Sequence, residues 1–187
     1  MLERSPDSTV STSDNEQSRE FTLSLVQTIS TILKNIILSQ ELSSSSSDKI
    51  NLFCLECVPS ISISDYLSRI VSYTNMETST LISSLIYIDR LCSNENIKLS
   101  FYNIYSIISI ALYLSIKFNE DTFCEEDFYA KVTGLSMSEI AKTSLVFMKI
   151  IDYKLYISIE EYKIYEEYIL KVFFSNYFCL TCYDRKI

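Results

Sequence analysis

Apolar side chains recur at intervals of three and four residues along most of this chain, which is the spacing of an amphipathic α-helix. The first such stretch covers residues 20–42 and predicts an N-terminal helix. Its apolar stripe consists of Leu25, Val26, Ile29, Ile32, Leu33, Ile36 and Ile37. A stripe of this length must pack against something, either the following domain or a partner.

Five more helices are predicted after this one. Ser64, Asn75 and Ser100 each stand at the start of an apolar-periodic stretch, where a short polar side chain can cap a helix N-terminus. Ser-x-x-Glu capping boxes at residues 136–139 and 158–161 open two further helices. The pattern therefore predicts an all-α protein, a compact bundle in which short links join the helices.

The stretch at residues 99–117 differs from its neighbours because it is apolar on nearly every face. Eighteen residues without a formal charge separate Lys98 from Lys117, so lipid or other helices must surround this segment. Serines interrupt it, no basic cluster flanks it, and the neighbouring segments all offer apolar faces. These features favour the central helix of a soluble bundle over a membrane span.

Composition narrows the possible functions. The 187 residues include one Gly and no His, which excludes histidine-based catalysis and a zinc–histidine site. The net charge of −8 opposes binding to nucleic acid or to an anionic membrane surface. Six Cys without a signal-peptide pattern predict an intracellular protein, in the cytoplasm or the nucleus.

Polar segments divide the chain. Residues 1–19 are rich in Ser, Thr and Asp and are expected to form a flexible tail. Five consecutive serines begin a Ser-rich linker at residues 43–60.

Four motifs in order carry a resemblance to a known family. They are YIDRL at residues 87–91, KFNED at 117–121, YAKV-x-GLS at 129–136 and DY-x-L-x-IS at 152–158. Together they resemble the cyclin box, and most closely the single-box P/U-type cyclins related to phosphate-signalling cyclins. The resemblance implies a five-helix cyclin box with a central third helix over residues 61–170. The N-terminal helix precedes this box, and a C-terminal extension at 171–187 follows it.

The resemblance also implies roles for individual residues. Arg69 and Asp89 match the family's structural ion pair between the first two helices of the box. Lys117 matches the lysine that contacts the αC helix of a cyclin-dependent kinase. The apolar part of this kinase-binding patch is implied for Leu114, Phe118, Leu145 and Met148. Ser144 stands where many relatives carry the glutamate that partners the lysine, so the Lys–Glu pair is expected to be incomplete.

The implied function is that of a regulatory cyclin subunit that binds and activates a cyclin-dependent protein kinase, with no catalytic residue and no cofactor of its own. The alternative is an interaction scaffold with a cyclin fold that has lost kinase activation, which Ser144 favours. The kinase, its substrates, and a role in the cell cycle or in nutrient signalling stay open.

Two Cys-x-x-Cys pairs flank the predicted box. Cys54 and Cys57 precede it, and Cys179 and Cys182 follow it. This spacing is that of a four-thiolate zinc site, but Leu lies inside each pair and neither has the glycine that helps such a turn. Free thiols are the favoured interpretation, and a zinc site is the alternative.

Overall fold

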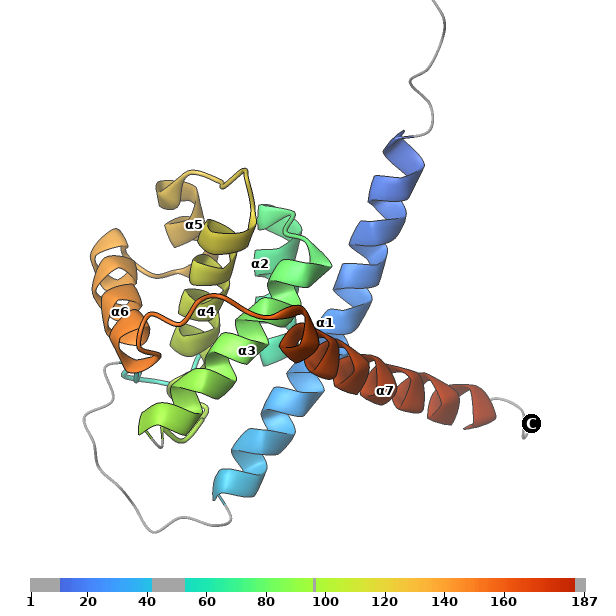
Figure 1. The fold of residues 1–187 in the computed structure, drawn as a ribbon. Helices are drawn as coiled ribbons and strands as arrows, with labels where there is room; N and C mark the ends of the chain where they lie inside the picture. Colours follow the sequence, from blue (N-terminus) through green and yellow to red (C-terminus); the bar gives the residue numbers. More distant parts are fainter. Residues whose placement is uncertain (1–10, 42–52, 96, 184–187) are drawn as a thin grey trace, which may run out of the picture.

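The computed structural model describes residues 11–41, 53–95 and 97–183, and no strand occurs among them. The seven helices of this part are α1 (Ser11–Glu41), α2 (Ile63–Thr74), α3 (Thr78–Glu95), α4 (Ile104–Asn119), α5 (Glu126–Thr133), α6 (Met137–Ile150) and α7 (Ile159–Tyr183) (Figure 1). The predicted all-α fold class is confirmed. The structure has one helix more than the pattern predicted, because α5 is only eight residues long and too short to show a clear apolar period.

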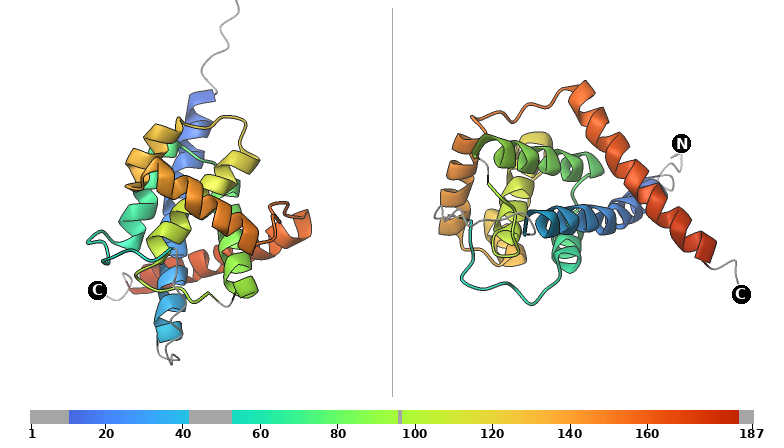
Figure 2. Two further views of the ribbon diagram at one scale, coloured as in Figure 1. Left: turned by 90° about the vertical axis from the view of Figure 1, so that its left-hand side faces the viewer. Right: turned by 90° about the horizontal axis from the view of Figure 1, so that it is seen from below.

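Helix α4 lies at the centre of the bundle (Figures 1 and 2). Its fully buried residues include Ile104, Ile107, Ile110, Ala111 and Leu112, which lie on different faces of one helix. Two of its buried serine hydroxyls have carbonyl partners, since Ser115 Oγ donates to the Thr80 carbonyl and Ser109 Oγ to the Tyr105 carbonyl, each at 2.7 Å. In the structure, other helices surround the long uncharged segment.

One predicted helix start is confirmed, and a glycine ends the helix before it. Ser136 and Glu139 form a complete capping box at the start of α6. Gly134 ends α5 in the left-handed conformation, with φ of 77°, which glycine adopts without steric cost. At the start of α7 only half of the predicted box forms: Ser158 Oγ accepts from the Glu161 N–H, but the Glu161 side chain is bound elsewhere, as described below.

The three single-residue caps are wrong. Ser62 caps α2 in place of Ser64, because Ser62 Oγ accepts from the Asp65 N–H at 3.0 Å. Asn75 follows Thr74 as the C-cap of α2, with φ of 53°, and does not begin α3. α4 begins after Asn103, whose Oδ1 accepts from the backbone N–H of Ser100. Several short polar residues stand near each of these ends, and the periodic pattern does not distinguish among them.

Helix α1 packs along α2 and also contacts α3 and α7. It begins at Ser11, so part of the predicted tail at residues 1–19 is helical. By length and composition alone, its segment Arg19–Gln40 is apolar enough to cross a membrane, and α4 is shorter than such a span. The predicted stripe faces the other helices, with Leu25, Val26, Ile29, Leu33 and Ile37 buried.

Helix α7 crosses α1 and extends beyond the rest of the bundle (Figures 1 and 2). It runs without interruption through the predicted boundary at residue 170. Most of the predicted Ser-rich linker lies outside the described residues, and the chain continues from Phe53, whose ring packs edge-on against that of Phe147 on α6.

Candidate functional site

The last turn of α4 carries Lys117, the first charged residue after the buried length of the helix. Its Nζ lies 2.7 Å from Oε1 of Glu126, which stands at the first position of α5. The same Nζ lies over the ring of Phe123, 4.4 Å from the ring centroid. The lysine side chain remains 40% exposed, so a fixed positive charge is presented at the surface.

Tyr113 completes this arrangement one turn before Lys117. Its hydroxyl donates to the same Oε1 of Glu126 at 2.9 Å. The hydrogen bonds from Lys117 and Tyr113 lower the pKa of Glu126 below its ordinary value. Burial, and then the neighbouring carboxylate, raise the pKa of Tyr113 to about 12. Glu126 is therefore ionised and Tyr113 neutral at physiological pH, which maintains both hydrogen bonds.

Lys117 has a carboxylate partner at a position that the family resemblance did not imply. Ser144 stands where many relatives carry the glutamate and supplies no charge, but Glu126 on α5 lies next to the lysine. Ser144 itself is only 5% exposed, and its Oγ has no hydrogen-bond partner in the described part of the chain. No sequence period connects Lys117 with Glu126, although the acidic run at residues 120–127 was a signal of available carboxylates.

The other predicted binding residues fall into two groups. Phe118 and Leu145 are large apolar side chains that are 51% and 46% exposed. Leu114 is buried, and Met148 is partly buried against the core. Leu145 and Met148 lie on α6, which contacts α4. An exposed lysine beside exposed apolar side chains is typical of a protein-binding surface.

The predicted ion pair between Arg69 and Asp89 is not present. The Arg69 guanidinium lies over the ring of Tyr66 at 5.2 Å, and its buried Nε has no hydrogen-bond partner among the described residues. Asp89 accepts a hydrogen bond from the hydroxyl of Tyr165 on α7 at 2.8 Å. The two residues therefore stabilise different contacts.

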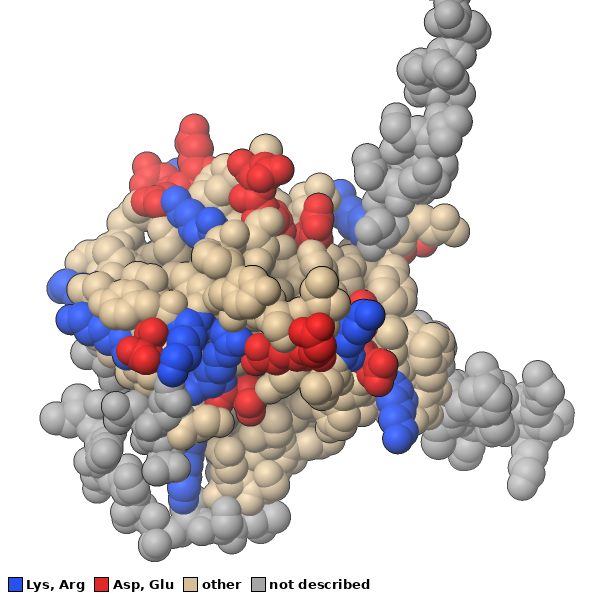
Figure 3. Space-filling view, in the orientation of Figure 1, with Lys and Arg blue, Asp and Glu red and all other residues tan. Residues whose placement is uncertain are grey.

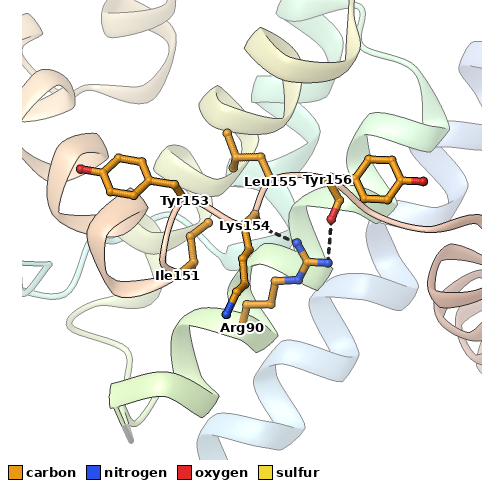
Figure 4. Close-up of a pocket in the computed structure, with 6 residues that line it drawn as sticks. All are labelled: Arg90, Ile151, Tyr153, Lys154, Leu155 and Tyr156. Atoms are coloured by element: carbon orange, nitrogen blue, oxygen red, sulfur yellow. Dashed lines mark hydrogen bonds between the residues drawn. The ribbon is translucent and has the colours of Figure 1, made fainter.

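Arg90, the next residue of the YIDRL motif, makes the ion pair that joins distant parts of the chain. Its Nη2 lies 2.7 Å from Oε2 of Glu161 on α7. Nη1 of the same guanidinium donates to the Lys154 carbonyl at 2.5 Å, and Nη2 donates to the Tyr156 carbonyl at 3.1 Å (Figure 4). The side chain is only 18% exposed. Sequence reasoning missed this role, although Arg90 lies within a motif that it singled out.

Tyr87 makes a third bond from the same motif to the same segment. Its ring is buried, and its hydroxyl donates to the Leu155 carbonyl at 2.7 Å. Tyr87, Asp89 and Arg90 thus all hold the α6–α7 connection or the first half of α7 against α3. We refer to these three residues and their partners as the α3–α7 clamp. The cavity beside Arg90, of about 330 Å³, is lined mainly by the connection itself, at residues 151–156 (Figure 4).

Only the first of the two cysteine pairs has side chains that the structure describes. Cys54 and Cys57 are free and exposed in the segment that packs beside α6. The C-terminal end of α7, which contains residues 179 and 182, lies on the opposite side of the molecule (Figure 1). The side chains of Cys179 and Cys182 lie outside the described ones. Among the residues that are described, no cluster of three or more metal-ligating side chains occurs.

Charges of both signs are interspersed on the face shown in Figure 3. Acidic atoms gather along its upper edge, over α5, and basic and acidic atoms lie next to each other across its middle. This distribution agrees with the net charge of −8 and offers no extended basic surface on this face.

Comparison with known proteins gives a consistent result. The family model described as Cyclin matches residues 1–155, which include α1 and end before α7. Similar proteins include Cyclin-U2-2 of Arabidopsis thaliana, 28% identical over 66% of this chain and 54% of that protein. PHO85 cyclin-like protein psl1 of Schizosaccharomyces pombe is 32% identical over 67% of this chain and 52% of its own length. PHO85 cyclin-7 of Saccharomyces cerevisiae is 29% identical over 79% of this chain and 60% of that protein. The chain thus spans little more than half the length of these relatives.

Proposed function

The chain belongs to the cyclin family, and from this we propose that it is the regulatory subunit of a cyclin-dependent kinase of the PHO85 type. The relatives named PHO85 cyclins support this choice of partner. Members of the family are non-catalytic regulatory proteins, which agrees with the prediction that this chain is not an enzyme. We place this function inside the cell, as the composition suggests.

The observation that carries the proposal is the surface at the end of α4. Lys117 is held in place by Glu126 and remains partly exposed, and Phe118 and Leu145 expose apolar surface. A lysine ammonium at this position can donate to carbonyl oxygens at the end of a partner helix, because those carbonyls lack intrahelical partners. The apolar side chains would bury their exposed surface against the same partner.

We propose that the partner element is the αC helix of the kinase. A cyclin activates a kinase by binding its active conformation more tightly than its inactive one, which shifts the population towards the active form. In a protein kinase the position of αC controls the catalytic Lys–Glu ion pair. Contacts from Lys117, Phe118 and Leu145 that form only with the active position of αC would supply this preference.

The proposal can be tested with purified PHO85 kinase of Saccharomyces cerevisiae as the probe. We expect the purified chain to bind this kinase and to raise its activity towards a peptide substrate. Lys117→Ala should weaken binding by about thirtyfold, the factor for a residue at the centre of an interface. Lys34→Ala, which removes an exposed lysine on α1, serves as the matched control and should bind as the wild type does. Equal binding by Lys117→Ala and wild type would contradict the proposed contact.

The alternative function, a scaffold that binds without activating, is favoured by Ser144. Its buried hydroxyl, unpaired within the described part of the chain, adds no charge to the binding surface. The same experiment separates the two functions: a scaffold would capture the kinase and leave its activity unchanged.

A further inference from the structure

We propose that Glu126 is a positioning residue that fixes the Lys117 ammonium in the orientation needed by the partner. The inference rests on the proposed function, because it concerns the same surface. Glu126 acts here through Lys117, without contacting the partner itself.

One carboxylate oxygen of Glu126 is held by two donors. Oε1 of Glu126 accepts from Lys117 Nζ at 2.7 Å and from the Tyr113 hydroxyl at 2.9 Å. Tyr113 therefore holds the carboxylate while the carboxylate holds the lysine. Lys117 ends α4 and Glu126 begins α5, so the pair fixes a flexible side chain between two rigid elements.

Aromatic rings support the Lys117 ammonium from below. Lys117 Nζ lies 4.4 Å from the centroid of the Phe123 ring, within the range of a cation–π contact. The Phe123 ring packs against those of Tyr113 and Tyr129, with centroid distances of 5.5 and 6.0 Å. Tyr129 is fully buried. The support thus continues into the core, and it limits the directions in which the lysine can move.

The Lys117 ammonium keeps donors for a partner while it is paired with Glu126. A lysine ammonium carries three N–H donors, and Glu126 accepts from one of them in the structure. The side chain is 40% exposed, so the other donors can reach acceptors of a partner. Glu126 therefore holds Lys117 in place without blocking it, and binding need not break the pair.

The matching control lies next to Glu126. Glu125 precedes α5, is exposed, and makes no side-chain cap to the helix. Glu125→Gln and Glu126→Gln change the net charge equally, but only the second removes the charged partner of Lys117. A general effect of charge on association would therefore appear in both variants.

The test is a double-mutant cycle in which binding to purified PHO85 kinase is titrated. We expect Glu126→Gln to weaken binding by about fivefold, which corresponds to the upper range for an exposed ion pair. Glu125→Gln should bind as the wild type does. In a Lys117→Ala background, Glu126→Gln should have no further effect, because its influence passes through the lysine. The unfolding midpoints of Glu126→Gln and Glu125→Gln should differ by no more than the small contribution of an exposed ion pair.

The possible failures can be told apart. If Lys117→Ala weakens binding but Glu126→Gln matches Glu125→Gln, the positioning role is wrong and the proposed function stands. If Glu126→Gln weakens binding equally with and without Lys117, Glu126 contacts the kinase directly and the inference is overturned. If the wild type does not bind the kinase, or Lys117→Ala binds normally, the proposed contact fails and the inference falls with it.

A charge exchange provides a second readout. The double variant Lys117→Glu with Glu126→Lys restores an ion pair between α4 and α5 but reverses its direction. We expect the exchange to retain the unfolding midpoint of the wild type and to lose binding as Lys117→Ala does. Restored binding would show that the pair serves only the fold, and would contradict the inference.

Discussion

Arg90 and Lys117 each pair with a glutamate at a distance of 2.7 Å, in two different regions of the molecule. In the α3–α7 clamp, Arg90 is mostly buried and donates to one carboxylate and two backbone carbonyls. At the end of α4, Lys117 is partly exposed and donates to one carboxylate. The ionic bond is the same in both, and the surroundings differ.

The difference indicates how one interaction can serve structure in one place and recognition in another. Removing one member of a buried pair leaves an uncompensated charge and unpaired carbonyls, which is strongly destabilising. Removing one member of an exposed pair leaves groups that water can solvate, so folding loses little. The clamp should therefore govern stability, and the lysine site should govern binding.

The largest expected effect is that of Arg90→Ala. It leaves Glu161 and the carbonyls of Lys154 and Tyr156 without their donor, and should lower the free energy of unfolding by about 3 kcal/mol. Denaturant unfolding followed by circular dichroism measures this change. Lys154→Ala is the control, since Lys154 pairs with Asp152 in full exposure at 3.2 Å and should have almost no effect. Equal free energies of unfolding for the two variants would show that the clamp contributes no more to stability than an exposed ion pair does.

Tyr87→Phe tests the clamp through a neutral group. It deletes the hydroxyl that donates to the Leu155 carbonyl, and should cost about 1 kcal/mol at neutral pH. Burial raises the pKa of Tyr87 to about 12, so the tyrosine's contribution is complete below its ordinary value of 10 and is lost as the pH rises through 12. Unfolding measured across this range should show the stability gap between wild type and variant closing. A gap independent of pH would contradict the burial of this hydroxyl.

Lys117→Ala tests how much the exposed ion pair contributes to stability. We expect it to change the free energy of unfolding by less than about 1 kcal/mol, because exposed ion pairs contribute little. The same denaturant experiment as for Arg90→Ala measures it. A loss as large as that of Arg90→Ala would show that Lys117 is a structural residue, and any weaker kinase binding would then follow from unfolding.

The smallest effect should appear at acidic pH. The hydrogen bonds from Lys117 and Tyr113 lower the pKa of Glu126 below its ordinary value of 4.5. Its contribution to stability is therefore complete above that value and is lost as the pH falls through the lowered pKa. The difference in unfolding midpoint between wild type and Glu126→Gln should be present at neutral pH and disappear in acid. A difference in unfolding midpoint that grows as the pH falls would contradict a lowered pKa of Glu126.

The features that could be predicted from the sequence are those that depend on residues close together in the chain. The period of three and four residues predicted the buried face of α1 and the central place of α4, because burial on one face repeats with the helical turn. The capping box of Ser136 and Glu139 was also predictable, since both partners lie within one turn. Lys117 was singled out by its position at the end of the apolar stretch together with the family resemblance.

Contacts between distant residues were not predictable in this way. Glu126 reaches Lys117 only because the chain reverses between α4 and α5, and Arg90 reaches Glu161 across 71 positions. The family resemblance implied an ion pair between Asp89 and Arg69, but in the structure α7 places the Tyr165 hydroxyl where it donates to Asp89. Side-chain partners of this kind depend on the arrangement of whole helices, which no single stretch of sequence contains.

The position of α1 has a consequence for how the chain is made. α1 leaves the ribosome before α2, α3 and α7, yet these later helices cover its apolar face. Until those helices are synthesised, a segment apolar enough to cross a membrane stands uncovered on the nascent chain. Chains truncated before α7 would keep part of that face uncovered and should depend on chaperones to stay in solution.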